Sequence, residues 1–343
     1  MNVKKPKTAL ITLLYIVALA LGCGITALYY RDVYSVIFAA GGAVSLWIFT
    51  SLCHELGHVI AAKASGFEII AFSCCGFRFD KTARVKFKFN PFSRVAGETA
   101  VIPDKARSGC ENGEKYPVIT LAGLIAHALT IIGYMLALVL CDNLLAKEFF
   151  AFFTLPLASF IVNGCKFFIP TSDAAVLAGF TSYKGEADAY DAYLNVLRFL
   201  RDGKTYAEID GRYFAYGECS SRLKAVMRLF SLRREEELGN MEDARLKAEN
   251  TPFGDVSDVE AQAEFLFIGY VSGSEDLISR YGAVAESLDG CDEPFAQRLR
   301  LAKAKYAGDE TYVKVAKPTA LKSCENEFFV GDGRFNKKII ENI

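Results

Sequence analysis

The sequence predicts a mainly α-helical polytopic membrane protein with four transmembrane helices, a β-hairpin between the second and third of them, and a soluble α-helical C-terminal domain. The first observation is composition. Of the 343 residues, 52% are hydrophobic and 13% aromatic, and the mean hydropathy is +0.21, which is more apolar than an ordinary soluble chain. The second is distribution, because residues 1–183 contain long uncharged runs and carry 16 Lys+Arg against 11 Asp+Glu. The third is that residues 184–343 have a polar, helical pattern, with 23 Lys+Arg against 29 Asp+Glu.

Four apolar runs are long enough to cross a bilayer, which takes about 20 helical residues. They lie at residues 8–30, 33 to about 64, 117–141 and 149–168. For the first run, a signal peptide cut after Ala20 or a lipoprotein signal ending at Cys23 is the alternative. Because apolar residues continue to Tyr30, which is too long for such a signal, we favour a retained helix.

Three regions follow: an N-terminal transmembrane helix at 1–32, a core at 33–183 with a hairpin at about 67–90, and a helical domain at 184–343. Glycine-separated helix pairs in the last region suggest repeats, although no fixed period is found. Its charged run at 233–237 is interpreted as a solvated helix face.

Orientation follows from the positions of Lys and Arg. The loop at 63–115 holds ten of them and the amino terminus three, whereas the two remaining connections hold only Arg31 and Lys147. We therefore expect an integral protein of a bacterial cell membrane, with the N-terminus, this loop and the C-terminal domain in the cytoplasm. The ten cysteines have no regular spacing, which argues for a reducing compartment and against a disulfide framework.

The hairpin is predicted from an alternating segment. In residues 84–89, Val85, Phe87 and Phe89 lie on one face and basic residues on the other, as in a half-buried strand. The partner strand is expected at 71–79, with a turn at 80–83. The alternative is a small surface sheet without a role in binding.

The candidate chemistry lies in the second apolar run, which contains His54-Glu-Leu-Gly-His58. Two histidines four residues apart share one face of a helix and can bind one Zn²⁺, while Glu55 takes a proton from a zinc-bound water as general base. A third ligand is needed, and Asp173 is the acidic residue at the end of a later apolar run, where Pro170 can break the helix. A structural histidine pair and a helix-capping Asp173 are the alternatives.

These residues resemble the site-2 protease family of intramembrane zinc metalloproteases. His54 to His58 fit the family's H-E-x-x-H helix, and Ala122-Gly-Leu-Ile-Ala-His127 fits a second packing motif in position, without its Pro and with His in place of Asn. Asn163 and Asp173 fit the third motif loosely, with Ala174 where Gly is usual. The resemblance implies a supporting role for Asn163. His127 is either a hydrogen-bond or oxyanion donor or a packing substitute.

The resemblance also implies a function. It predicts a zinc endopeptidase, with one Zn²⁺ per chain, that cuts the transmembrane segment of another membrane protein in regulated proteolysis. In relatives a β-hairpin is thought to engage substrate as an extended strand, which points to Val85, Phe87 and Phe89 as substrate-binding residues. The helical domain is a candidate site for a cytoplasmic regulator.

Two other functions are considered. A membrane scaffold or pseudoprotease would bind partners through its helical tail and keep the metal site for structure alone. A transporter lacks support, because there are few spans and no repeated pair of broken helices. Nucleic acid is not expected as a partner, since no long basic tract with interleaved aromatic residues is present.

Overall fold

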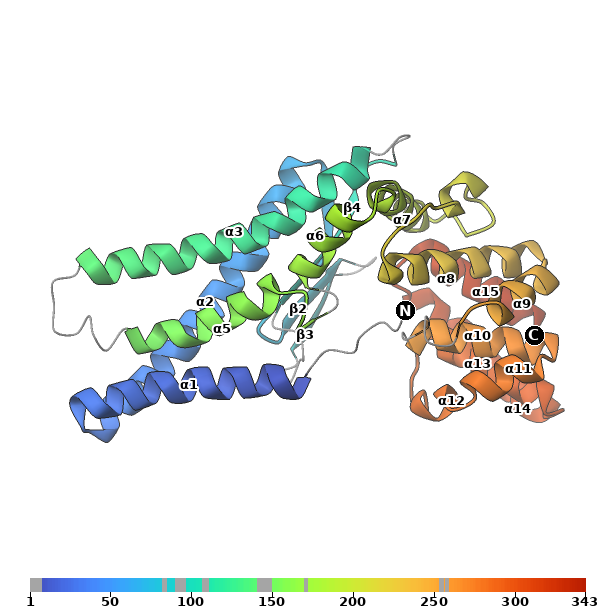
Figure 1. Cartoon of the computed structure of the whole chain (residues 1–343). Helices are drawn as coiled ribbons and strands as arrows, with labels where there is room; N and C mark the ends of the chain where they lie inside the picture. Colours follow the sequence, from blue (N-terminus) through green and yellow to red (C-terminus); the bar gives the residue numbers. More distant parts are fainter. Residues whose placement is uncertain are drawn as a thin grey trace. The chain divides into compact units, whose positions relative to one another are not determined.

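The computed structural model is mainly helical and divides into two compact units (Figure 1). Of the described residues, those within 8–104 and 114–182 form the core unit, and those within 105–113 and 183–343 form the C-terminal unit. The residues that the structure describes are 8–81, 85–89, 97–106, 111–140, 150–169, 172–252, 256 and 259–343.

Three helices are long and apolar enough to cross a membrane, which indicates a membrane protein: α1 (Thr8–Tyr30), α2 (Val33–Ala64) and α3 (Glu111–Leu140), the last of which belongs to the core unit from Glu114 onward. The predicted first and second runs are confirmed as helices. Helix α2 begins where it does because the Asp32 carboxylate accepts a hydrogen bond from the Ser35 N–H at 2.8 Å. Helix α3 begins before Pro117 and carries this proline near its start.

The predicted fourth run does not form one spanning helix in the described residues. It contains the short 3₁₀ turn η1 (Phe150–Phe153) and α5 (Thr154–Gly164). The 11 residues of α5 extend about 16 Å, roughly half of a bilayer core. Cys165 is extended, so the helix ends there, and a new helix, α6 (Asp173–Ser182), leads on from α5 (Figure 1). Pro170, which was predicted to break the helix, lies outside the described residues.

The predicted hairpin region is a four-stranded antiparallel sheet of order β3-β2-β1-β4. Its strands are β1 (Phe67–Cys74), β2 (Phe77–Lys81), β3 (Val85–Phe89) and β4 (Gly97–Pro103). The predicted strand at 71–79 is wrong in one respect, because the chain reverses within it at Cys75 and Gly76. Both have positive φ, 48° and 89°, as a two-residue hairpin turn of type I′ requires. Asp80 lies in β2 instead of in the expected turn, and β4 was not predicted.

The sheet is attached to the helix that carries the histidines. Helix α2 passes into β1 through Ser65 and Gly66, and the carbonyl of Gly66 accepts a hydrogen bond from the N–H of Asp104, just after β4, at 3.0 Å. Phe67 of β1 and Ile102 of β4 are fully buried. Strands β1 and β4 therefore pack on α2, while β2 and β3 extend the sheet away from it.

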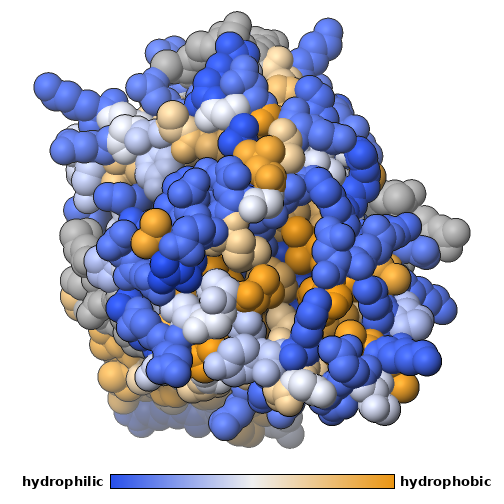
Figure 2. All heavy atoms as spheres, turned by 90° about the vertical axis from the view of Figure 1, so that its right-hand side faces the viewer, coloured by the Kyte–Doolittle hydropathy of each residue, from blue (hydrophilic) through white to orange (hydrophobic). Residues whose placement is uncertain are grey.

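The C-terminal unit is built of helices packed side by side, and Figure 2, from its side of the molecule, shows a mostly hydrophilic surface crossed by a narrow hydrophobic band. Its elements are α7 (Glu186–Arg201), η2 (Gly211–Phe214), α8 (Ser221–Leu238), α9 (Met241–Glu249), α10 (Val259–Ser272), α11 (Glu275–Tyr281), α12 (Val284–Ser287), α13 (Pro294–Tyr306), α14 (Glu310–Ser323), η4 (Cys324–Asn326) and α15 (Val330–Asn342).

The interpretation of residues 233–237 as a solvated face is wrong. Arg233 and Glu236 are buried in α8, where Arg233 donates a hydrogen bond to Glu264 of α10 at 2.7 Å. Arg298 of α13, also buried, pairs with both Glu236 and Glu264. Buried charges are tolerated only when they are paired, and here the partners come from other helices, so the charged run is part of the core.

Candidate metal centre

Helix α2 places His54 and His58 one turn apart, so that both rings occupy the same side of the helix. The two Nε2 atoms are 3.2 Å apart. Both histidines and the intervening Glu55 are buried, with exposed fractions of 5%, 8% and 4%. Three ionisable side chains are thus enclosed within an otherwise apolar helix.

Asp173 joins the histidines from the first residue of α6. Its Oδ2 lies 3.0 Å from Nε2 of His54 and 3.4 Å from Nε2 of His58. Asp173 is not the helix cap. Ser172 caps this helix, because its hydroxyl oxygen accepts a hydrogen bond from the N–H of Ala175 at 3.3 Å. The Asp173 carboxylate is therefore free to face the histidines, and the predicted triad is brought together.

The triangle of these three atoms fits a metal ion. Its edges are 3.0, 3.2 and 3.4 Å. Ligand atoms about 2.0–2.1 Å from a tetrahedral ion are separated by about 3.3 Å. In addition, Asp173 Oδ2 is buried without a hydrogen-bond donor. Two imidazole nitrogens and a carboxylate oxygen converging at this spacing form a possible site for a divalent cation.

Groups behind the triad orient His58. Its Nδ1 lies 2.8 Å from the carbonyl oxygen of Ile119 on α3, an acceptor, so Nδ1 carries the proton and Nε2 is left unprotonated, the form that can bind a metal. Gly123, one turn further along α3, lies against the same ring: a Cβ at this position would be 2.3 Å from His58 Nε2. Helix α3 therefore both fixes the tautomer and leaves the space that the ring needs.

The carboxylate of Glu55 contacts strand β4. The hydroxyl of Thr99 donates to Oε2 of Glu55 at 2.6 Å. A Cβ at Gly97 would lie 2.3 Å from Oε1. The sequence analysis missed Thr99, Gly97 and the Ile119 carbonyl, and no local pattern marks them, because each acts across a tertiary contact. Gly123 lies in the second packing motif, but its contact with His58 was not predicted.

The two supporting residues differ in position. His127 on α3 is fully buried with its ring centre 5.6 Å from that of His54, and its Nε2 lies 3.2 Å from the carbonyl oxygen of Pro156 on α5. Its ring packs against that of His54, but His127 is outside the triad. Asn163 lies near the end of α5 and, among the described residues, makes no hydrogen bond to the triad.

The predicted substrate-binding residues lie on β3, at the edge of the sheet away from α2. Phe87, whose side chain is 56% exposed, packs against Phe79 and Phe77 of β2. Cross-strand pairing links Phe87 to Phe79, Phe79 to Phe72, and Phe72 to Thr99, so these four residues form one row on a single face of the sheet. The side chains of Val85 and Phe89 are not described. Phe87 therefore shares a sheet face with Thr99 but does not reach the triad.

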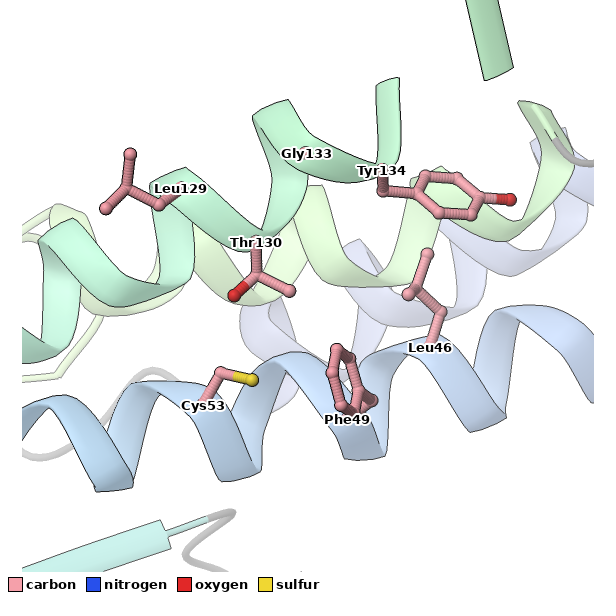
Figure 3. A pocket seen from close by; sticks show the side chains of 7 residues that line it. All are labelled: Leu46, Phe49, Cys53, Leu129, Thr130, Gly133 and Tyr134. Atoms are coloured by element: carbon pink, nitrogen blue, oxygen red, sulfur yellow. The ribbon is translucent and has the colours of Figure 1, made fainter. Parts of the chain in front are cut away.

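An apolar cavity of about 450 Å³ opens between α2 and α3 (Figure 3). The hydroxyl of Thr130, which faces it, already donates to the carbonyl of Ala126 at 2.8 Å, so this group does not require a polar ligand. The triad is not among the lining residues, which are Leu46, Phe49, Cys53, Leu129, Thr130, Gly133 and Tyr134.

Comparison of the chain with known protein families, with curated proteins and with solved structures found no match.

Proposed function

We propose that this protein is a zinc-dependent intramembrane endopeptidase. The observation that carries the proposal is the convergence of His54, His58 and Asp173 at ligand spacing, with the buried carboxylate of Glu55 beside them. Two histidines and one carboxylate leave a fourth position open, as catalytic rather than structural zinc sites do. When bound, zinc supplies a Lewis acid that makes water acidic and polarises a peptide carbonyl.

The side chains divide the remaining work. His54, His58 and Asp173 would hold the ion. Glu55 would accept a proton from the attacking water and pass it to the amine that leaves, as a general base and then a general acid. Burial of Glu55 excludes competing solvent from its carboxylate.

The proposed membrane arrangement keeps four crossings, the fourth being interrupted. The 11 residues of α5 and the 10 of α6 would together extend about 31 Å, close to the thickness of a bilayer core. A break in mid-membrane is tolerated where it lines a protein cavity, and here it would place Asp173 at the metal. Four crossings return the chain to its starting side, which agrees with a cytoplasmic N-terminus and a soluble cytoplasmic C-terminal unit that could bind a regulator.

The substrate would be a transmembrane segment of another protein. A helical peptide bond is shielded by its own hydrogen bonds, so the segment must be partly unwound before it is cut. The exposed aromatic row that leads from Phe87 through Phe79 towards Thr99 offers an apolar surface on the same sheet face as the base. Val85, Phe87 and Phe89 remain predicted to contact substrate there.

The proposal is tested by co-expressing the protein with a library of tagged single-span membrane proteins and measuring which are shortened. Wild type should shorten at least one, and Glu55→Gln should shorten none while retaining about one zinc per chain. Glu114→Gln, which makes the same chemical change at an exposed position of α3, is the matched control and should cleave normally. If Glu55→Gln cleaves like wild type, the protein is not a protease of this kind, and the scaffold function is favoured.

A further inference from the structure

Strand β4 touches both oxygens of the carboxylate that is proposed as the base. The hydroxyl of Thr99 donates a hydrogen bond to Oε2 of Glu55, with 2.6 Å between the two oxygens. Gly97, two residues earlier and on the same strand face, leaves room for Oε1, since a Cβ there would be 2.3 Å from this atom. One oxygen is thus held by a hydrogen bond, and the other occupies space that only glycine provides.

The strand that makes these contacts is fixed relative to α2. Strand β4 pairs with β1 from Phe67↔Pro103 to Cys74↔Gly97, and Thr99 is directly opposite Phe72. Strand β1 follows α2 after a two-residue turn, and this turn is also hydrogen-bonded to Asp104 beyond β4. The Thr99 hydroxyl is therefore positioned by backbone pairing and not by a flexible loop.

We propose that Thr99 of β4 is a positioning residue for the reaction, because its hydroxyl orients the Glu55 carboxylate. Gly97 is required because any side chain at its position would occupy the space of that carboxylate. The proposal depends on the proposed protease function. A glutamate side chain has three rotatable bonds, so an unrestrained carboxylate would spend most of its time away from the attacking water. Misplacement of a catalytic group by about 1 Å can cost about 100-fold in rate. The hydroxyl should therefore affect turnover more than substrate binding.

A purely structural role predicts something different. If the bond served only to satisfy a buried carboxylate, its loss would lower the stability of the protein or its zinc content, and the turnover per zinc-loaded molecule would not change. The two roles are separated by measuring kcat, KM, zinc per chain and the unfolding midpoint on the same samples.

The experiment uses the full-length protein in detergent with a substrate that wild type cleaves and Glu55→Gln does not. Thr99→Val, which keeps a branched strand residue and removes only the hydroxyl, should lower kcat on the order of 10- to 100-fold with KM and zinc content unchanged. Thr99→Ser should restore most of the activity. Thr181→Val, at an exposed site of α6, is the matched control for the same substitution.

A second variant reaches the same carboxylate by a different route. Gly97→Ala places a methyl group against the end of a flexible side chain, so Glu55 and not the backbone must move. It should lower kcat to a similar degree while zinc is retained. A wild-type kcat in Thr99→Val, or no recovery in Thr99→Ser, would overturn the positioning role alone. A wild type that cleaves no substrate would overturn the protease function and this role with it.

Discussion

Replacement of Gly123 by alanine should weaken zinc binding at the proposed site while leaving the fold intact. The added Cβ would lie 2.3 Å from both Cε1 and Nε2 of His58, about 1.1 Å short of the 3.4 Å at which ordinary contact begins. The ring cannot retreat freely, because its Nδ1 is held by the Ile119 carbonyl at 2.8 Å on the same helix. The imidazole must therefore turn or shift by about 1 Å.

A shift of this size is large for a metal ligand. Zinc sites tolerate deviations of only about 0.2 Å from the preferred ligand distances. Loss of a group that merely orients a ligand typically weakens metal binding about 10- to 100-fold. Displacement of His58 itself should cost more, and we expect zinc affinity in Gly123→Ala to fall by at least about 100-fold.

The assay is a titration of the purified, zinc-loaded protein with a chelator of known affinity, with zinc per chain measured after each step. Gly133→Ala is the control on the same helix, because a Cβ there meets open space and should leave zinc binding unchanged. Helical content by circular dichroism checks the fold of both variants. Wild-type zinc affinity in a folded Gly123→Ala protein would show that α3 does not lie against His58 as described.

Two further predictions concern stability. Gly57→Ala should lower the free energy of unfolding by about 1–3 kcal/mol, because the added Cβ would lie 2.6 Å from the carbonyl oxygen of Ala122 on α3. An unchanged unfolding midpoint would contradict this close approach of α2 and α3. In the C-terminal unit, burial and the nearby charge of Asp332 raise the pKa of Glu327 to about 8 from an ordinary value of 4.5. The folded state then holds the proton more tightly, so this stabilisation is complete below pH 4.5 and is lost as the pH rises to 8. Between pH 6 and 8.5 the unfolding midpoint should decrease less in Glu327→Gln than in wild type. An equally large decrease in the variant would show that Glu327 does not cause it.

The parts that were predicted correctly depend on local patterns. A long, predominantly apolar run determines a membrane-length helix from its own composition, which is why α1 and α2 have the expected bounds. The spacing of His54 and His58 fixes their common face through helix geometry alone. Asp173 was found because a zinc site needs a third ligand and Asp173 is the acidic residue at the end of a later apolar run.

The parts that were missed depend on contacts between distant segments. The reversal at Cys75 and Gly76 divides an apolar run that looks like one strand, and Gly76 is the local signal that could have indicated it. Nothing near Thr99 indicates that it meets Glu55, 44 positions away. Arg233 has the sequence context of a surface residue, and only its carboxylate partners on α10 and α15 make its burial possible.

Glycines determine whether the motif can work as a site. His54, Glu55 and His58 are recognisable in sequence because ionisable side chains are unusual in an apolar helix. Their geometry depends on space that three glycines leave. Gly57, within the motif, allows the backbone of α3 to approach α2. Gly123 leaves room for the ring of His58, and Gly97 leaves room for the carboxylate of Glu55. These glycines lie on α2, α3 and β4. On each of these elements, the missing side chain leaves the space that the site occupies. A chain that kept the two histidines and Glu55 but carried larger residues at these three positions would keep the motif and lose the site.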